Sequence, residues 1–441
     1  MNVKVPRRIL DLDAIDGTEL DWRYKGVPAR AMGTKLADIG SLGLDVLREE
    51  VLFPSALVKL SAIEHNSRWM RRFLEAEGVE ICPHGKTTMA PQLFERQFQD
   101  GAWGLTAATV GHVRIYRAHG VRRILFANQL VGAPDIEYVL DELERDAAFD
   151  FYCLIDSAAG LRRLASAVER RRGCRTIQVL IEVGAPGGRT GVRSLDEGVA
   201  LALEVKRHSP AIALRGIEAF EGVFGGYDHP QLESVVGRML DDVVALATRG
   251  ESEGWFAPGE ILLTAGGSAF FDLVARRLRD ARLLGRARVI LRSGCYLTHD
   301  SHHYEVYLER MRERSPDIVA LGAGLKAAVE VVAYVQSTPE RGLAIAGFGK
   351  RDVSYDIALP TPLWCLRPGV HNRPQAINGE CRVATLNDQH AYIHASGNPW
   401  FQVGDLMGVG ISHPCTTFDK WPLLLVVDDD YKVVSAIRTF F

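Results

Sequence analysis

The sequence predicts a (β/α)8 barrel followed by a second, β-rich domain. From Phe53 to about residue 310, short aliphatic runs alternate with longer amphipathic segments, which is the pattern of βα units. About eight or nine such repeats in roughly 250 residues match the size of an eight-stranded barrel. A doubly wound open sheet is the alternative. Beyond residue 310 the runs are short, β-rich and separated by Gly, Pro and Asn, which predicts a separate domain of strands.

The individual elements follow from this rhythm in chain order. The strands expected in the first part are 55–60, 80–83, 104–107, 123–127, 151–155, 177–183, 214–220, 261–265 and 288–291. The helices expected between them include 63–77, 158–172, 195–207, 230–249 and 271–284. The strands expected in the second domain are 329–336, 343–346, 382–386, 391–394, 406–411 and 423–427.

Three regions are expected along the chain. Residues 1–50 are polar, and glycines interrupt any long pattern, so we expect an N-terminal extension that packs on the β-rich domain. Residues 51–310 make up the expected barrel. Residues 311–441 make up the C-terminal β-rich domain.

Composition indicates a folded protein that acts on small molecules. The chain has 441 residues, 47% of them hydrophobic, with 52 Lys and Arg against 55 Asp and Glu. The resulting charge of −3 argues against nucleic acid or a membrane surface as the main partner. The seven cysteines are scattered without a CxxC pair, which is typical of a reducing compartment. No secretion signal or long apolar run is visible, and we therefore expect a cytoplasmic protein.

A lysine follows the second expected strand, in the segment Pro83-His84-Gly85-Lys86-Thr87. Barrel enzymes carry their catalytic groups at the carboxyl ends of the strands, so Lys86 would lie in the barrel mouth. Desolvation there disfavours the ammonium form and yields an amine able to form a Schiff base. The alternative is a solvated surface lysine.

Two glycines and a serine follow the strand expected at 261–265. Such a strand-to-helix turn lets the backbone N–H groups of Gly266 and Gly267 approach an anion, with help from the Ser268 hydroxyl. A phosphate site is common at this place in barrels. The alternative is a bare tight turn.

The last barrel strand ends in an arginine. Arg292 would point into the barrel mouth beside a cofactor, and the amides of Gly294 and Cys295 could meet a phosphate. Alternatively, Arg292 pairs with a buried carboxylate such as Asp156 or Glu182. A second cation, Arg189, lies in a glycine-rich loop after a strand and is either aimed inward or solvated.

A histidine and a cysteine flank Pro414. Proline restricts the preceding residue to extended backbone, so His413 and Cys415 should project to the same face. An imidazole and a thiolate favour zinc, and only two protein ligands would leave positions open for substrate or water. A coincidental histidine and a buried cysteine are the alternative.

The order of these motifs resembles that of a known family. The motifs are PHGKT at 83–87, GGRTGV at 187–192, AGGS at 265–268, LRSGCY at 291–296 and HPC at 413–415. Together they resemble the D-serine dehydratase and D-threonine aldolase family. Its members are fold-type III pyridoxal-phosphate enzymes with an alanine-racemase-like barrel. The resemblance runs from about Phe53 to the C-terminus, and PHGKT and HPC are its most specific parts.

The resemblance implies a cofactor, a metal and a set of site residues. Lys86 would hold pyridoxal 5'-phosphate and act as a catalytic residue. His413 and Cys415 would bind the metal, Zn2+ or another divalent cation, and take part in catalysis. The other residues matched to cofactor binding are His84, Arg189, Gly266, Gly267, Ser268, Arg292, Gly294, Cys295 and Tyr296. A homodimer is implied as well.

The cysteine of the HPC motif favours one reaction. The resemblance implies cysteine at this position in the dehydratase branch and aspartate in the aldolase branch. Cys415 therefore favours zinc and β-elimination of a D-3-hydroxy amino acid, with D-serine converted to pyruvate and ammonia. The alternatives are an aldolase acting on D-threonine or 3-hydroxyaspartate, and a pyridoxal-phosphate-binding protein without turnover.

Overall fold

The computed structural model describes residues 8–171, 173–224, 229–281, 283, 285–377, 379–396 and 401–441. The chain divides into two compact units. The barrel unit comprises Arg71–Lys86 and Gln97–Gly294. The sheet unit comprises the residues up to Met70 together with Thr87–Arg96 and Cys295–Phe441.

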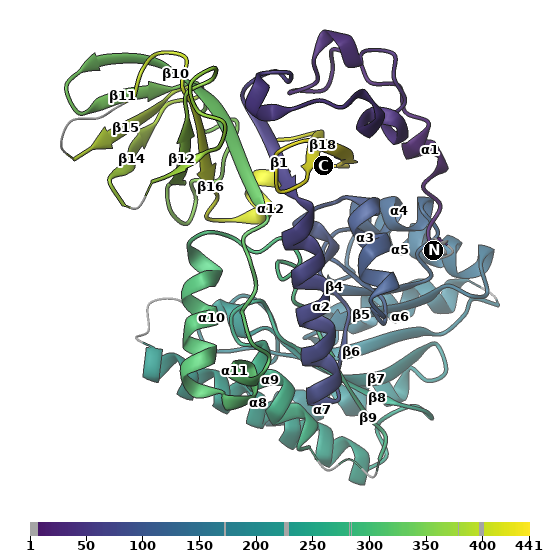
Figure 1. Ribbon diagram of the computed structural model, residues 1–441. Helices are drawn as coiled ribbons and strands as arrows, with labels where there is room; N and C mark the ends of the chain where they lie inside the picture. Colours follow the sequence, from purple (N-terminus) through teal and green to yellow (C-terminus); the bar gives the residue numbers. More distant parts are fainter. Residues whose placement is uncertain are drawn as a thin grey trace, which may run out of the picture. The chain divides into compact units, whose positions relative to one another are not determined.

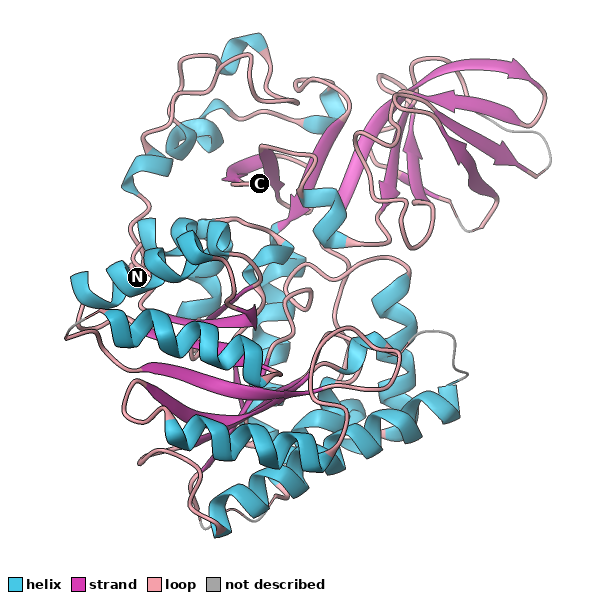
Figure 2. Ribbon diagram, turned by 180° about the vertical axis from the view of Figure 1, so that it is seen from behind, coloured by secondary structure: helices cyan, strands magenta, loops and turns pink. Residues whose placement is uncertain are grey.

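The barrel unit contains eight parallel strands in the order β2-β9-β8-β7-β6-β5-β4-β3. Figures 1 and 2 show these strands with helices along their outer side. Backbone hydrogen bonds close the ring between its two end strands: the Trp103 N–H donates to the Ile81 carbonyl (2.8 Å), and the Thr106 N–H donates to the Pro83 carbonyl (2.9 Å). A bridge between His84 and Thr106 completes this join. The predicted eight-stranded barrel is confirmed.

The bounds of the barrel elements agree closely with the expected ones. The strands are β2 Glu80–Ile81, β3 Leu105–Ala107, β4 Arg123–Gln129, β5 Asp150–Ile155, β6 Ile177–Val183, β7 Ile212–Ala219, β8 Ile261–Ala265 and β9 Ala287–Leu291. The helices are α2 Leu60–Glu77, α3 Pro91–Gln99, α4 Val110–Ala118, α5 Ala133–Arg145, α6 Ala158–Arg170, α7 Leu195–Arg207, α8 His229–Ser252 and α9 Phe271–Arg279, of which α2 and α3 begin or end in the sheet unit.

Local chemistry explains where these helices begin and what they cover. The Ser157 and Ser194 side chains cap α6 and α7 by accepting backbone N–H groups of the first turn. The apolar stripe of α6 is buried, and its opposite face carries arginines. α8 packs on β7 and α9 on β8 and β9, so the helices cover the outside of the ring.

Side chains fill the inside of the ring. The packed cluster consists of Cys82, Leu125, Tyr152, Leu154, Leu180, Leu262 and Ile290, with Trp103 and Ala127 against it. Successive residues of a strand point alternately inward and outward, which places one apolar residue or more from each contributing strand in this core. The polar groups described below therefore gather beyond it, where the strands end.

The sheet unit is built on strands in the order β13-β12-β16-β10-β1-β17-β18, with β11, β15 and β14 joined to β10. Their bounds are β1 Ser55–Lys59, β10 Val329–Glu340, β11 Leu343–Ala346, β12 Thr361–Leu366, β13 Gln375–Ala376, β14 Cys381–Leu386, β15 Ala391–Ala395, β16 Leu406–Gly410, β17 Leu423–Val427 and β18 Val433–Arg438. The helices of this unit include α10 His303–Arg314, α11 Pro316–Ala320 and α12 Pro414–Phe418. The predicted β-rich second part is confirmed.

One strand differs from the sequence-based expectation. The run 55–60 begins the βα rhythm, but β1 pairs antiparallel with β10 and parallel with β17, in the sheet unit. The reason is that Ala56, Leu57 and Val58 are buried on both faces, and such a continuous apolar run fits the centre of either sheet.

The N-terminal segment contacts the last strand of this sheet. The Val433 N–H donates to the Leu44 carbonyl (2.8 Å), and the Val46 N–H donates to the Tyr431 carbonyl (3.1 Å). Gly40 lies against the backbone of Val434, where a Cβ atom would collide with the carbonyl group. Residues 40–46 thus cover the edge strand β18.

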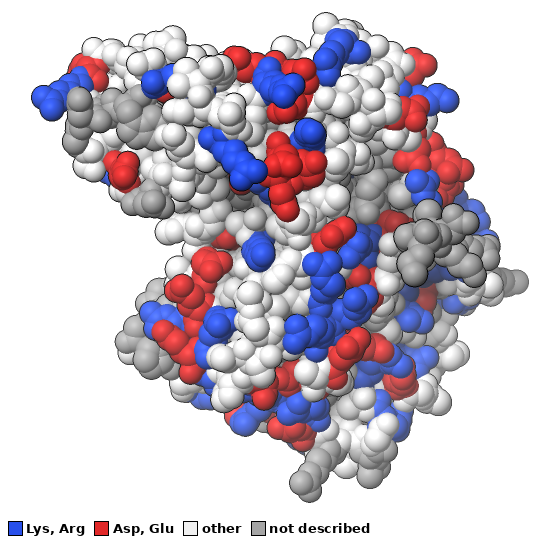
Figure 3. All heavy atoms as spheres, viewed as in Figure 1, with Lys and Arg blue, Asp and Glu red and all other residues white. Residues whose placement is uncertain are grey.

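Charge and hydropathy add two observations on the described residues. On the face shown in Figure 3, basic and acidic side chains are interspersed. Among the described residues, no helix combines the length and the apolar character that crossing a membrane requires.

Candidate functional site

Lys86 lies in the barrel unit, directly after the second strand. It belongs to the short 3-10 helix η4, Gly85–Thr87, which follows the bridge at His84. Gly85 is required here because a Cβ atom would collide with the hydroxyl of Tyr116. The Lys86 side chain is exposed, whereas the sequence analysis expected desolvation. The reason is that Lys86 follows the last hydrogen bond and the bridge of the ring, at Pro83 and His84, and therefore lies outside the packed interior.

His84, two residues earlier, is a partly buried imidazole. Burial lowers the pKa of His84 well below its usual value, and the positive charges of Lys86 and Arg292 lower it further, so the ring is neutral. Its Nδ1 is buried without a hydrogen-bond partner in the described part of the chain. A buried polar atom in this condition is available to a bound polar ligand.

The turn after β8 binds an anion, but one that the sequence analysis missed. The N–H groups of Gly266 and Gly267 donate to the two carboxylate oxygens of Glu221, at 3.1 and 2.5 Å. Gly266 has a φ of 92°, in the region that favours glycine. Glu221 is buried, and this burial raises its pKa. The two N–H groups that were expected to meet a phosphate are therefore occupied by a carboxylate of the chain itself.

Two further bonds tie this turn to the end of β9. The Ser293 hydroxyl donates to the Gly266 carbonyl at 2.9 Å, and the Arg292 N–H donates to the same carbonyl at 3.1 Å. Ser268 and Gly294 lie on these two neighbouring segments, also in the barrel unit. The structure thus brings the AGGS and LRSG motifs together, as the strand order implies.

Arg292 is paired with a buried glutamate. It is 7% exposed, its guanidinium lies against the carboxyl group of the fully buried Glu218, and it donates to the Ala219 carbonyl at 2.6 Å. Burial raises the pKa of Glu218 to about 8, against the opposing influence of Arg292. The Arg292 Nε and both Glu218 oxygens have no hydrogen-bond partner in the described chain.

The buried partner of Arg292 is a different one from those considered from sequence. Glu182 instead accepts hydrogen bonds from the Thr190 hydroxyl (2.6 Å) and from the Gln129 amide. Asp156 accepts the Gly191 N–H at 3.3 Å. Glu218 was not considered because its run, 214–220, was assigned only as a strand.

The second cation of this region, Arg189, is exposed. Its guanidinium lies 5.1 Å from the ring centre of Phe220, and that of Arg292 lies 6.0 Å from the same ring. Both contacts are cation–π interactions. The two arginines that sequence motifs singled out therefore flank one aromatic ring.

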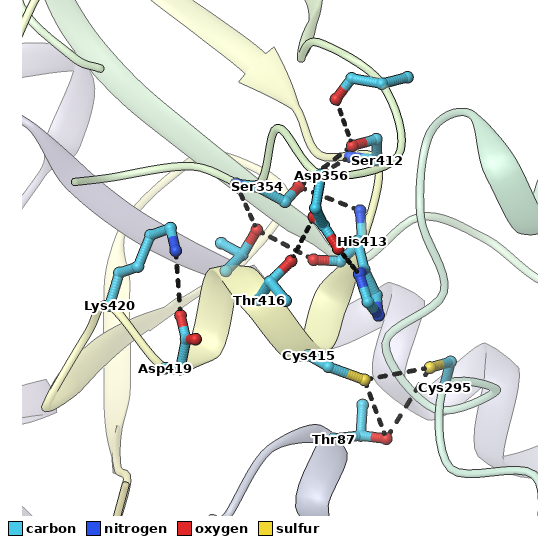
Figure 4. A network of polar contacts seen from close by, with 12 residues as sticks. Thr87, Cys295, Ser354, Asp356, Ser412, His413, Cys415, Thr416, Asp419 and Lys420 are labelled. Atoms are coloured by element: carbon cyan, nitrogen blue, oxygen red, sulfur yellow. Dashed lines mark hydrogen bonds and ion pairs between the residues drawn. The ribbon is translucent and has the colours of Figure 1, made fainter. Parts of the chain in front are cut away.

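The HPC motif lies in the sheet unit, between β16 and α12. His413 has extended backbone (φ −151°, ψ 107°), as expected before proline, and Pro414 begins the helix α12. The His413 Nδ1 lies 2.6 Å from Oδ2 of Asp356. The Oδ1 of Asp356 accepts a hydrogen bond from the Thr416 hydroxyl at 2.7 Å (Figure 4). Asp356 had no signal in the sequence.

The sulfur of Cys415 has close neighbours from two distant segments. Its Sγ lies 3.8 Å from Sγ of Cys295 and 3.6 Å from Oγ1 of Thr87. The same Thr87 oxygen lies 3.8 Å from the Cys295 sulfur, so the three groups form a triangle (Figure 4). Cys295 and Tyr296 are buried in the sheet unit.

Charge separates within this cluster. The hydrogen bond from the Cys295 thiol lowers the pKa of Cys415 well below its usual value, against the effect of burial, and His413 adds to the lowering. The pKa of Cys295 is raised by the same hydrogen bond and by burial. For His413, burial acts downward, but hydrogen bonds to Cys415 and Asp356 outweigh it and raise the pKa to about 9. The result is a thiolate beside an imidazolium.

These groups suit a soft metal ion. A thiolate and an imidazole are donors that zinc prefers, and Asp356 holds the ring nitrogen that a ligating histidine commonly offers to a carboxylate. Among the described residues, no three or more His, Cys, Asp or Glu side chains are grouped to hold a metal.

Comparisons with known families explain both units. Residues 58–259 match the family described as "Alanine racemase, N-terminal domain", and residues 328–427 match "Putative serine dehydratase domain". The chain belongs to the fold-type III pyridoxal-phosphate enzymes. The predicted family and the alanine-racemase-like barrel are thus confirmed.

Among relatives in this fold-type III family, the D-threonine aldolase of Arthrobacter sp is 27% identical over 288 residues, covering 62% of this chain and 72% of that protein. The D-threo-3-hydroxyaspartate dehydratase of Delftia sp. (strain HT23) is 27% identical over 243 residues, covering 51% of this chain and 63% of that protein. The homologues are thus lyases that act on D-3-hydroxy amino acids.

Solved structures of the family show the same fold. The D-threonine aldolase from Filomicrobium marinum superimposes with a TM-score of 0.72 at 20% identity, covering 90% of this chain and 97% of that one. A cysteine-to-alanine variant of a D-threo-3-hydroxyaspartate dehydratase, solved in a metal-free form, gives a TM-score of 0.67 at 19% identity, covering 90% and 99%.

Fold-type III enzymes bind pyridoxal phosphate, and the barrel unit fits this group. The buried Nδ1 of His84 and the Nε of Arg292 have no hydrogen-bond partner within the described chain. Lys86 supplies an exposed amine two residues from His84. Buried polar atoms normally have a hydrogen-bond partner. A polar cofactor bound at the ends of the strands would supply the missing partners.

Proposed function

We propose that the chain is a pyridoxal-phosphate- and zinc-dependent dehydratase of a D-3-hydroxy amino acid, converting D-serine to pyruvate and ammonia. The observation that carries this proposal is the pairing of His413 with Cys415, together with the contact of the His413 Nδ1 with Asp356. Nitrogen and sulfur donors favour zinc, and zinc aids departure of a hydroxyl group. The resemblance associates cysteine at this position with dehydration.

Lys86 is the proposed anchor and base. Its amine would bind the aldehyde of the cofactor; once the substrate amine replaces it, the free amine would take the proton from the substrate Cα. Bound pyridoxal phosphate supplies an electron-accepting ring that stabilises charge at Cα. Lys86 directly precedes Thr87 in the chain, and Thr87 contacts the Cys415 sulfur.

The remaining barrel residues would orient the cofactor. Arg292, fixed by Glu218 and the Ala219 carbonyl, and Arg189, on Phe220, are the proposed ring-side cations. Ser268 and the backbone N–H groups of Gly294 and Cys295 are the proposed phosphate donors. His84 and Tyr296 complete the proposed cofactor site.

Glu221 gives the glycine turn a second proposed role. Gly266 and Gly267 remain phosphate-site residues in the proposal, but their N–H groups are engaged by the Glu221 carboxylate. We infer that Glu221 fixes the turn, so that the groups that follow it on the chain face the phosphate.

Substrate turnover tests the proposal directly. Purified full-length protein, loaded with pyridoxal phosphate and zinc, is incubated with D-serine, with L-serine as the matched control. Keto acid and ammonia from the D isomer only are expected, and a chelator should abolish them. Production from L-serine, or an undiminished rate without metal, would contradict the proposal.

An aldolase is the second candidate, supported by the 27% identity to a D-threonine aldolase over 62% of this chain. The same donors could polarise a β-hydroxyl for cleavage of the Cα–Cβ bond. D-threonine and 3-hydroxyaspartate isomers distinguish the two reactions, because an aldolase yields glycine and an aldehyde. Absence of any turnover in cofactor- and zinc-loaded protein would favour a pyridoxal-phosphate-binding protein without catalysis.

The setting of the enzyme is also proposed. We expect a cytoplasmic homodimer that takes a small D-amino acid and neither nucleic acid nor a membrane as partner. Light scattering of the loaded protein gives the molar mass: two chains of 48.7 kDa support the dimer, and a single chain contradicts it.

A further inference from the structure

Two thiols lie close together in the sheet unit. The proposed reaction uses only one of them, because it does not need the thiol of Cys295. The Sγ atoms of Cys295 and Cys415 lie 3.8 Å apart, although the residues are 120 positions apart in the chain. Cys295 lies in the segment between β9 and α10, and Cys415 lies in α12. All seven cysteines are free, and Figure 4 shows these two sulfurs pointing toward each other.

We propose that Cys295 and Cys415 form a reversible disulfide that disables the metal site. The consequence for the metal rests on the proposed function, because the Cys415 sulfur is one of the two proposed zinc donors. A sulfur bonded to another sulfur is no longer a thiolate, so the site would retain His413 alone.

Exposure assigns different parts to the two sulfurs. Cys415 is partly exposed, whereas Cys295 is 5% exposed. An oxidant in solution therefore reaches Cys415 first, and Cys295 is the resolving thiol beside it. This arrangement of an accessible sulfur and a nearby resolving sulfur is typical of reversible thiol oxidation.

The approach that the reaction needs is short. A disulfide bond is about 2.05 Å long. The two sulfurs, which are 3.8 Å apart, must therefore approach each other by a little under half of that distance. Rotation about the Cα–Cβ bond, the χ1 torsion, moves each sulfur. The Thr87 oxygen, 3.6 Å from the Cys415 sulfur, remains as a polar neighbour throughout.

The chemistry balances with hydrogen peroxide as the oxidant. The Cys415 thiolate attacks one peroxide oxygen, the O–O bond breaks, hydroxide leaves, and the sulfur becomes a sulfenic acid. The Cys295 sulfur then attacks the Cys415 sulfur, the S–O bond breaks, and the Cys295 proton leaves with the hydroxyl as water. Two thiol sulfurs lose two electrons in total, and one peroxide molecule takes them up. A dithiol reductant reverses the change.

A third cysteine provides a control. Cys174 is likewise partly exposed, but its thiol donates to the adjacent Arg175 carbonyl at 3.4 Å. It belongs to the barrel unit and to neither proposed binding site. The Cys174→Ser variant should therefore behave as the unaltered protein in the experiment below.

Peroxide treatment and peptide mapping test the inference. Metal-free and zinc-loaded full-length protein are exposed to hydrogen peroxide, alkylated and digested with trypsin. Peptides 293–310 and 383–420 should appear joined, and the join should disappear with dithiothreitol. Oxidation of the zinc-loaded sample should release about one zinc per chain, measured with a chromogenic chelator, and dithiothreitol should restore binding.

Variants and a sulfenic-acid probe make the result decisive. Cys295→Ser should give no joined peptides and should leave Cys415 trapped as a dimedone adduct, while Cys174→Ser still gives the joined pair. A dimedone adduct on Cys415 in the unaltered metal-free protein, without joined peptides, would overturn the inference. A disulfide in a protein that binds no zinc would overturn the proposed function and the switch, but would keep the pair as an oxidation site.

Discussion

Oδ2 of Asp356 lies 2.6 Å from Nδ1 of His413. This contact occupies one ring nitrogen and leaves Nε2 as the nitrogen that can bind a metal. A carboxylate in that place also fixes the ring orientation and makes the ligating nitrogen a stronger donor. Asp356 is itself held by the Thr416 hydroxyl at 2.7 Å, so the ring, the carboxylate and helix α12 are linked.

Replacing Asp356 should weaken zinc binding. Asp356→Asn keeps the shape of the side chain but removes its charge, and we expect a loss of about 10- to 100-fold in zinc affinity. Competition with a chelator of known affinity measures it. Asp419→Asn is the matched control, because Asp419 is the exposed residue next to α12 and pairs with Lys420. Equal affinities of the Asp356 variant and the unaltered protein would show that this carboxylate does not support the metal.

Zinc affinity should rise with pH. Hydrogen bonds to Cys415 and Asp356 raise the pKa of His413 to about 9, so its ring is protonated at pH 7 and zinc must displace that proton. Cys415 is already a thiolate because its pKa is lowered. Near neutral pH and up to about pH 9, each zinc therefore releases one proton from the pair, and affinity gains about tenfold per pH unit. Zinc titrations at several pH values check this. A gain of a hundredfold per unit would mean that Cys415 also loses a proton.

Lys86 should be the amine that carries the cofactor. Lys86→Ala is expected to lose the visible absorbance of the protein-bound cofactor, because no amine remains to form the Schiff base. Lys206→Ala, on the exposed side of α7, should keep it. Spectra of both variants after dialysis against excess pyridoxal phosphate give the answer. Persistence of the band in Lys86→Ala, with borohydride reduction of the Schiff base fixing the cofactor on another lysine, would assign the anchor elsewhere.

Glu218 should make the free energy of unfolding depend on pH. Burial raises its pKa from 4.5 to about 8, so between these values the folded chain keeps a proton that the unfolded chain has released. The free energy of unfolding therefore falls as pH rises through this window, by up to about 1.4 kcal/mol per unit.

The Glu218→Gln variant should flatten this dependence, since it has no proton to release. Urea unfolding at pH 5.5 and 7.5 compares the two proteins. The exposed Glu253→Gln serves as the control, and its pH dependence should match that of the unaltered chain. A Glu218→Gln variant with the same slope as the unaltered protein would show that Glu218 is ionised throughout.

The sequence predicted the barrel because short stretches of neighbouring residues determine each of its strands and helices. Strands and helices such as β6 and α7 are set by short runs and by caps such as Ser194, which a sequence displays directly. The sheet to which β1 belongs could not be predicted, since its pairing with β10 joins residues more than 270 positions apart. A five-residue strand with three apolar residues contains no information about such a distant partner.

The candidate site divides in the same way. Lys86, Arg292, His413 and Cys415 lie in motifs of three to six residues, and the conformation of His413 followed from the proline after it. Glu221, Asp356 and the meeting of Cys295 with Cys415 had no such signal. Their contacts span 45, 57 and 120 positions, and they exist only because packing brings the segments together.

The join of the barrel has a consequence for cofactor loading. β2 contributes two residues to the ring, Glu80 and Ile81. Beyond them the described chain continues the join through the Cys82 N–H, which donates to the Leu291 carbonyl, the Thr106 N–H, which donates to the Pro83 carbonyl, and the bridge at His84. Lys86 follows this join directly in the chain. A cofactor bonded to its amine would therefore be attached next to the segment that closes the ring. Because a ligand stabilises the state that it binds, cofactor binding would also stabilise the closed barrel.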